Sequence, residues 1–268
     1  MAPPAKRKGT PQRPGRKLLR YDRGLELRFV AGVDEVGRGC LAGPLVAAAV
    51  VLDYTSLVGP KAASLAHLND SKKLSRDMRE RLFDVVMECA TATSVVVISA
   101  NTIDRRGLHK SNIAALCTAI NRLRAPIDMA LVDGFAVPLD CANRRVIKGD
   151  STSAAIAAAS IVAKVTRDRM MCRLDETLDG RWAFGEHMGY ATPLHHERIH
   201  AHGVSDHHRM SFDSQAYRVG VSEGVGEVLD PFDASVVVAI DDVDIEAVLT
   251  DAPLVASVGS HPGDGSPA

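Results

Sequence analysis

The stretch Val33-Asp34-Glu35-Val36-Gly37-Arg38-Gly39 places two adjacent carboxylates between an apolar run and a glycine-rich loop. Residues 29–33 are typical of a buried strand, and the glycines permit positive φ angles that let backbone amides approach a ligand closely. Adjacent side chains on a regular strand face opposite sides. We therefore expect a kink, supplied by these glycines, if Asp34 and Glu35 are to point to one place.

The rest of the chain to about residue 212 alternates between strand and helix patterns. Apolar, Val- and Ala-rich runs at 45–52, 94–99, 129–132 and 145–147 predict further strands. Helical spacing predicts helices over 113–123 and 153–174, capped by Ser111 or Asn112 and by Asp150 or Ser151. This order predicts a mixed α/β domain.

Two more acids stand where strands are predicted to end. Asp133 follows residues 129–132, and Asp150 lies between residues 145–147 and the second helix. Carboxylates gathered at strand ends repel one another and require cations, and hard oxygen ligands favour magnesium or manganese. Taken singly, each acid is also explained as a turn former, and Asp150 as a helix cap.

Nucleotide-cofactor motifs are missing from the same loops. Gly37, Gly39 and Gly43 miss the third position of a dinucleotide fingerprint by one residue. The segment 148–151, Lys-Gly-Asp-Ser, lacks the upstream glycine of a phosphate-binding loop. A nucleotide cofactor is therefore not expected.

The opening stretch, continued by Gly43-Pro44-Leu45-Val46, resembles the first motif of bacterial ribonuclease HII. Four more segments resemble that family in its order: 70–75 (DSKKLS), 131–134 (LVDG), 148–168 (KGDS through AAASIVAKVTRD) and 189–212 (GYAT, His195 and HRMSF). The resemblance covers residues 25–212. Arg38, between the two glycines, favours type HII over the sister type HIII.

The resemblance implies an RNase H-like fold, a five-stranded mixed β-sheet flanked by helices. It implies an endonuclease that hydrolyses the RNA strand of RNA–DNA hybrids and cuts 5′ of single ribonucleotides embedded in duplex DNA. Such a cut leaves a 3′-hydroxyl and a 5′-phosphate, and serves ribonucleotide removal and DNA repair.

By the same resemblance, catalysis and metal binding fall on four acids: Asp34, Glu35, Asp133 and Asp150. They are expected to hold two Mg²⁺ or Mn²⁺ ions, with Asp34 bridging them, and Asp168 stays open as an alternative to Asp150. The substrate-binding residues are expected to be Gly37, Arg38, Gly39, Lys72, Lys148 and Tyr190, with Tyr190 stacking on a sugar and the cations meeting phosphates.

Charge divides the chain into three parts although its net charge is −1. Residues 1–24 are Pro-rich and basic, and we expect a disordered arm. Residues 25–212 form the expected catalytic domain. Residues 213–268, with eleven acids and one base, are expected to be a partly disordered acidic extension. We expect a solubilising appendage, and the alternative is a segment that competes with nucleic acid and lowers nonspecific affinity.

Compartment and assembly follow from simpler features. The five scattered cysteines have no C-x-x-C spacing, which indicates a reducing compartment. No apolar run has the roughly 20 residues of a membrane helix, and no secretory signal is seen. We expect a cytoplasmic monomer that acts on nucleic acid and not at a membrane.

Three alternatives stay open at this point. His196-Glu197-Arg198-Ile199-His200 is a literal H-E-x-x-H, which with Asp206 as third ligand would indicate a zinc metalloprotease. A transposase- or resolvase-type nuclease on the same fold would cut plain DNA. A hybrid-binding protein without activity is the alternative that is not an enzyme.

Overall fold

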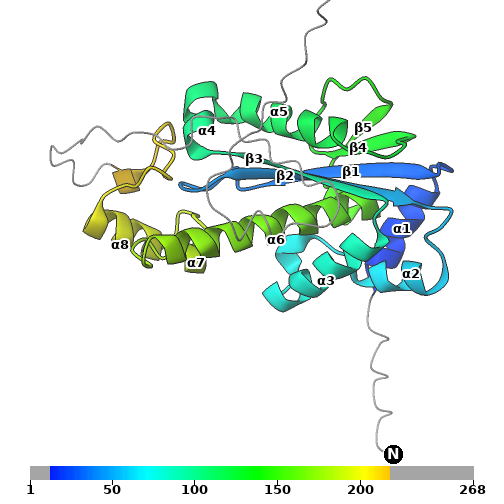
Figure 1. Cartoon of the computed structure of the whole chain (residues 1–268), viewed down its shortest axis with the longest axis horizontal. Helices are drawn as coiled ribbons and strands as arrows, with labels where there is room; N and C mark the ends of the chain where they lie inside the picture. The colour runs from blue at the N-terminus through cyan, green and yellow to red at the C-terminus, as the bar shows by residue number, and fades with distance from the viewer. Residues whose placement is uncertain (1–12, 218–268) are drawn as a thin grey trace, which may run out of the picture.

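The computed structural model describes residues 13–217 and shows a central β-sheet between two layers of helices (Figure 1). The strands are β1 (Phe29–Val36), β2 (Leu45–Asp53), β3 (Ala92–Ile98), β4 (Met129–Asp133) and β5 (Asn143–Val146). The helices are α1 (Gly15–Arg23), α2 (Gly59–Ser64), α3 (Arg76–Cys89), α4 (Ala100–Arg106), α5 (Leu108–Asn121), α6 (Ala154–Thr177), α7 (Phe184–His187) and α8 (Pro193–His202). Four 3₁₀ turns complete the set: η1 (Leu65–His67), η2 (Ser71–Lys73), η3 (Gly149–Ser151) and η4 (Gln215–Tyr217).

The sheet has the order β3-β2-β1-β4-β5 and is mixed. β1 pairs antiparallel with β2 and parallel with β4, and β4 pairs parallel with β5. α4 and α5 cover one face, and α6 lies along the other with α1 and α3 beside it (Figure 1). The predicted five-stranded mixed sheet flanked by helices is confirmed.

The small residues of α6 bring this helix unusually close to the central strand. A Cβ atom on Gly32 of β1 would lie 2.1 Å from the carbonyl carbon of Ala155, so no larger residue fits there. Six of the first seven residues from Ala154 to Ser160 are fully buried. This contact fixes where α6 begins, and therefore where the loop that carries Asp150 meets β1 and β4.

The basic N-terminal segment corrects one expectation. Residues 15–23 form α1, whose Leu18 and Leu19 are buried in the core against α6. The buried Asp22 carboxylate accepts hydrogen bonds from the Tyr54 hydroxyl (2.5 Å) and the Ala155 amide (2.9 Å). The expected disordered arm over 1–24 is therefore wrong for residues 15–23, because the basic residues lie on one face and the leucines on the other. Residues 1–12 lie outside the described part.

Helix starts also differ from the expected positions. α6 is capped by Ser153, whose hydroxyl accepts a hydrogen bond from the Ile156 amide, and not by Asp150 or Ser151. α5 begins at Leu108, so Ser111 and Asn112 are buried inside the helix instead of capping it. In both cases the packing of the helix on the sheet decides where the helix begins, and therefore which residue stands at its N-cap.

A buried histidine cluster lies beyond the end of α6, packed on Trp182 and Phe184. His187 and His195 stack with ring centroids 4.2 Å apart, and the Nε2 atoms of His195 and His208 are hydrogen bonded at 3.1 Å. Burial lowers the pKa of His195 to about 4 and that of His208 to about 3. Both imidazoles are thus neutral near pH 7 and act as structural hydrogen-bonding groups.

The C-terminal end of the described chain packs on this region. Ala216 is buried, and the Tyr217 hydroxyl donates to the Leu41 carbonyl at 2.8 Å. The expectation for the acidic extension otherwise falls on residues 218–268, outside the described residues. Over residues 13–217, no helix is long and apolar enough to cross a membrane.

If α1 is part of the core, truncating its buried face will destabilise the protein. We expect Leu19→Ala to lower the free energy of unfolding by about 2–5 kcal/mol, because it leaves a cavity against α6. Lys17→Ala, at an exposed position of the same helix, should change it by less than about 0.5 kcal/mol. Urea denaturation measures both, and equal effects would show that α1 is not core.

The histidine cluster predicts two imidazoles that do not titrate in the ordinary range. We expect the ring ¹⁵N shifts of His195 and His208 to remain those of neutral imidazole at pH 5.5 in NMR spectra. Unfolding restores a pKa near 6.5, so proton uptake favours the unfolded chain below that pH and the two residues make the fold less stable as the pH falls. A titration of either ring near pH 6.5 would contradict the buried cluster.

Candidate active site

Asp34 and Glu35 are the sixth and seventh residues of β1, and the strand stays regular through both. Asp34 pairs with Ala48 and Glu35 with Ala47 in an unbroken antiparallel register. The expected kink is therefore wrong. The two carboxylates leave opposite faces of the strand: Asp34 lies against Ser160 of α6, and Glu35 against Asn112 of α5. The two acids nevertheless belong to one group of charges, because the Glu35 carboxylate is close enough to Asp34 to raise its pKa.

Asp133 ends β4 directly beside Asp34. Val33 is in parallel register with Val132, so the following residues, both acids, lie at the same level on neighbouring strands. The Gly149 amide donates to Asp133 Oδ1 at 2.6 Å, which fixes the carboxylate and ties it to the turn that carries Asp150. The parallel pairing of β1 and β4 is thus what brings the acids together.

The pKa values of these acids record burial and mutual repulsion. Burial, then the neighbouring Glu35 and Asp133 carboxylates, raise the pKa of Asp34 well above its usual range. Burial raises the pKa of Glu35 to about 7, with Asp133 adding to the rise and the Arg38 guanidinium opposing it. The Arg38 and Glu35 side chains form an ion pair at 3.6 Å. The site therefore carries more negative charge than its own cations balance.

Asp150 lies on η3, facing the same edge of the sheet. Burial and then the Asp70 and Asp133 carboxylates raise its pKa, and Lys72 opposes the rise. Asp70 is thus a fifth acid at the site that sequence analysis missed as a functional candidate; its place at the head of the 70–75 motif was the available signal. Asp70 itself also forms an ion pair with Lys73 at 3.3 Å.

Asp168, the alternative fourth acid, is held elsewhere. Its carboxylate forms ion pairs with Lys164 at 2.6 Å and Arg79 at 3.5 Å, and all three side chains are largely buried. Asp168 is not among the groups that raise the pKa of Asp34, Glu35 or Asp150, whereas the Asp133 carboxylate raises all three. The geometry therefore favours Asp150 over Asp168.

The donor set suits divalent cations that prefer oxygen. Glu35 Oε2 is buried and has no hydrogen-bond partner within residues 13–217, so this acceptor oxygen is available to a cation. In the described part of the chain, no three Asp, Glu, His or Cys side chains already converge on one metal position. The carboxylates surround the site as separate ligands, and their unbalanced charge is what a cation would neutralise.

The glycine-arginine-glycine loop is held by two buried arginines that sequence analysis did not single out. Arg167 of α6 and Arg209 are both fully buried, and between them they bind six main-chain carbonyls. Arg209 donates to Gly37, Arg38 and Gly43, and Arg167 to Ala42, Pro44 and Met188. Gly37 has φ 91°, and a Cβ there would meet Arg167 Nε at 2.3 Å. Only glycine fits between this clamp and the site.

The clamp also brings Tyr190 to the loop. Tyr190 forms an isolated β-bridge with Cys40, and the Leu41 amide donates to the Gly189 carbonyl at 2.8 Å. The His195 ring binds the Tyr190 carbonyl, so the histidine cluster supports this segment from behind. The tyrosine ring stays about one-third exposed beside Gly39, as a residue that contacts substrate requires.

The two expected lysines differ in their positions. Lys72 is exposed on η2 and close enough to the acids to lower the pKa of both Glu35 and Asp150. Lys148 is exposed too, with a left-handed backbone (φ 53°), and it is not among the groups that shift the pKa of these acids. Lys72 therefore belongs to the site by geometry, and Lys148 only by its place next to the Gly149–Ser151 turn.

The H-E-x-x-H segment forms α8, in which His196 and His200 are one turn apart as the motif predicts. Together with Asp206 they do not make a group of three that could hold a metal among residues 13–217. The buried residues of this helix are Ile199, which packs in a small apolar cluster, and His195, which belongs to the histidine cluster and is not one of the motif's two histidines.

Comparison with known proteins places this arrangement in a family. Residues 31–215 match the family model described as Ribonuclease HII. The chain is 47% identical over 199 residues to Ribonuclease HII of Geobacillus kaustophilus, covering 73% of this chain and 74% of that protein. It is also 47% identical over 201 residues to Ribonuclease HII of Sinorhizobium fredii, covering 73% and 83%.

Solved structures share the fold. The ribonuclease H2 of Pyrococcus horikoshii superposes with a TM-score of 0.59 at 27% identity, covering 71% of this chain and 95% of that one. Bst-RNase HIII in complex with Mn²⁺ has a TM-score of 0.58 at 20% identity, over 71% and 68% of the two chains, and supports the fold alone. The match over residues 31–215 and the identity over most of its length establish that the chain belongs to the ribonuclease HII family and is a ribonuclease H endonuclease.

Proposed function

We propose that this ribonuclease H cuts the RNA strand of RNA–DNA hybrids and incises duplex DNA 5′ of single embedded ribonucleotides, using two divalent ions. The observation that carries the proposal is the grouping of Asp34, Glu35, Asp133 and Asp150 at one edge of the sheet, where burial and neighbouring carboxylates raise the pKa of Asp34, Glu35 and Asp150. Bst-RNase HIII, which shares the fold, was solved in complex with Mn²⁺.

Asp34, Glu35, Asp133 and Asp150 are the residues that would hold the ions. Asp34 lies between Glu35 and Asp133 in the electrostatic network, and the Gly149 amide fixes Asp133. Bound Mg²⁺ or Mn²⁺ would supply an activated water and charge stabilisation for the leaving 3′ oxygen. The chain's own part is to hold these carboxylates apart and fixed, so that their charge is ready when the ions arrive.

Recognition of the ribonucleotide would rest on the clamped loop. Only the 2′-hydroxyl distinguishes RNA from DNA at one nucleotide, and the Gly37–Gly39 backbone is the rigid polar surface nearest the acids. Tyr190 is placed to stack on the neighbouring sugar, while Arg38 and Lys72 meet phosphates. Arg38 is positioned by its contact with the Phe135 ring, 4.6 Å from the guanidinium carbon.

The remaining proposals concern the biological role, the compartment and the oligomeric state of the protein. The specificity for embedded ribonucleotides implies a role in ribonucleotide removal and DNA repair. We propose that the protein works as a cytoplasmic monomer on nucleic acid.

Cleavage of a labelled DNA duplex with one ribonucleotide tests the function directly. With Mg²⁺ or Mn²⁺ supplied in turn we expect a single cut 5′ of the ribonucleotide and none in the presence of a chelator. Asp34→Asn should lower kcat by about 10²–10³-fold or more, the effect of losing one preorganised electrostatic group. An all-DNA duplex is the control. A wild-type protein that leaves the ribonucleotide intact with both metals, or cuts plain DNA equally, would refute the proposal.

Asp150 and Asp168 form a matched pair for the fourth acid. Asp150→Asn should reduce kcat strongly and leave the free energy of unfolding nearly unchanged or raised, because the carboxylate sits in a repulsive cluster. Asp168→Asn should cost about 3–5 kcal/mol of stability by leaving Lys164 and Arg79 unpaired in a buried place. The folded fraction of Asp168→Asn should keep its kcat. The reverse pattern in single-turnover cleavage would make Asp168 the ligand.

A further inference from the structure

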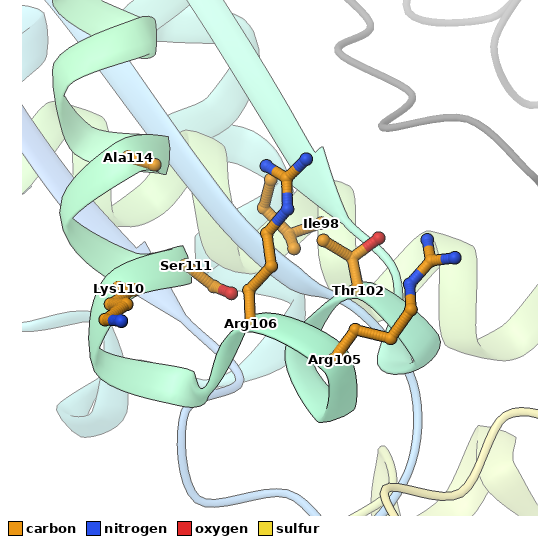
Figure 2. Close-up of a pocket in the computed structure, with 7 residues that line it drawn as sticks. All are labelled: Ile98, Thr102, Arg105, Arg106, Lys110, Ser111 and Ala114. Carbon is orange, nitrogen blue, oxygen red and sulfur yellow. The ribbon is translucent and has the colours of Figure 1, made fainter.

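A basic pocket of about 330 Å³ lies where α4 meets α5, outside the acidic site. Its lining includes Ile98, Thr102, Arg105, Arg106, Lys110 and Ser111, three cations with no acid (Figure 2). Arg105 and Arg106 extend from the last turn of α4 toward Thr102 and Ile98 (Figure 2). We call this hollow the α4–α5 pocket.

Ser111 gives the pocket an unused hydrogen-bond donor. Its side chain is 97% buried, and Oγ has no hydrogen-bond partner within residues 13–217. In Figure 2 the hydroxyl is turned toward the Arg106 side chain, on the pocket side of α5. Buried hydroxyls normally have a partner, and an acceptor oxygen between Ser111 and the arginine would provide one.

The helix ends add to the positive potential. α5 is 14 residues long, and its N-cap Gly107 offers no side chain to the first-turn amides. Arg105 and Arg106 balance the negative end of α4, which is their ordinary role. Lys110 has no such explanation, because a cation in the first turn of α5 is repelled by the positive end of the helix dipole. An anion in the pocket would offset that repulsion.

The pocket is next to the catalytic edge of the sheet. Ser111 precedes Asn112, which lies against Glu35, and the His109 ring is 6.2 Å from Phe135, the residue that contacts Arg38. Ile98 pairs with Leu45 at the end of β2 that faces the loop after β1. Two strand spacings of about 4.8 Å separate β3 from β1. In a nucleic acid strand that distance, roughly 10 Å, spans about three nucleotides of axial rise.

We propose that the α4–α5 pocket binds a backbone phosphate of the substrate duplex a few nucleotides from the scissile bond. The two arginines and Lys110 neutralise the phosphate, and Ser111 and the first-turn amides of α5 donate to its oxygens. The contact is independent of base sequence and fixes the register of the duplex over the acids. This inference rests on the proposed function, since it assigns the pocket a part of the same substrate.

Binding without cleavage tests the pocket. Fluorescence anisotropy in a chelator measures the affinity for a duplex of about 20 base pairs with one central ribonucleotide, over a series of salt concentrations. We expect Arg106→Gln with Lys110→Gln to weaken binding on the order of tenfold and to reduce the slope of log affinity against log salt by about 1. Lys17→Gln with Lys61→Gln removes the same charge from exposed positions on α1 and α2, and should leave the slope unchanged.

The Ser111→Ala variant measures the contribution of the hydroxyl to binding apart from that of the cations. We expect a loss of about threefold in affinity with an unchanged salt slope, because the hydroxyl carries no charge. Equal affinities and slopes for the pocket variant and its control would overturn the proposal. A pocket that binds free phosphate and not the duplex would also overturn the proposal. In that case inorganic phosphate, compared with chloride at equal ionic strength, raises the Tm of the wild type but not that of the pocket variant. The affinity for the duplex is then the same for both proteins.

The binding assay does not depend on catalysis. A wild-type protein that binds the duplex with the expected dependence on the pocket, but fails to cut it with either metal, would overturn the proposed function and leave the pocket assignment standing. Normal cleavage by a pocket variant with unaltered binding would do the opposite.

Discussion

The parallel pairing of β1 with β4 is the interaction on which the site depends. It sets Asp34 and Asp133 at the same level on neighbouring strands, in a buried place where their charges repel. That repulsion is unfavourable, and contacts elsewhere in the fold offset it. α6 packs on Gly32 with no space between the two backbones, and the Gly149 amide holds the Asp133 carboxylate. A looser sheet would let the carboxylates separate and lose the charge density that attracts cations.

The second constraint is the main-chain clamp around the Gly37–Gly39 loop. Arg167 and Arg209 donate to six carbonyls, five of which lie more than a hundred residues away in the sequence. Burying a guanidinium is unfavourable unless its donors are satisfied, so the two arginines hold the loop in one conformation. The neutral histidine cluster does the same for Tyr190 from the other side. The surface that we propose for substrate recognition is thereby rigid, although it is formed by loops.

Charge is distributed in a way that the composition conceals. The acids are collected at one edge of the sheet, while Arg38, Lys72 and the α4–α5 pocket surround them with cations. The surrounding cations would attract a polyanionic duplex, and the acids among them would attract divalent ions. The chain's overall charge of −1 therefore says little about its affinity for nucleic acid, because the sum includes segments outside this surface.

The sequence by itself determined the fold class and the family, because these follow from strand periodicity and from motifs that keep their order and spacing. It also named the four acids that we propose as metal ligands. Sequence analysis failed where segments far apart in the chain compete for the same position in the fold. It did not predict that α1 would be part of the core, that Ser153 would cap α6, or that β1 would run straight through both acids. The positions of Asp70, Arg167 and Arg209, and the buried ion pairs that favour Asp150 over Asp168 as fourth acid, are also visible only in the tertiary structure. The physical reason is that the burial of a residue and its partners depend on its position in the folded chain. A local sequence pattern records only which structures and contacts the residue is able to form.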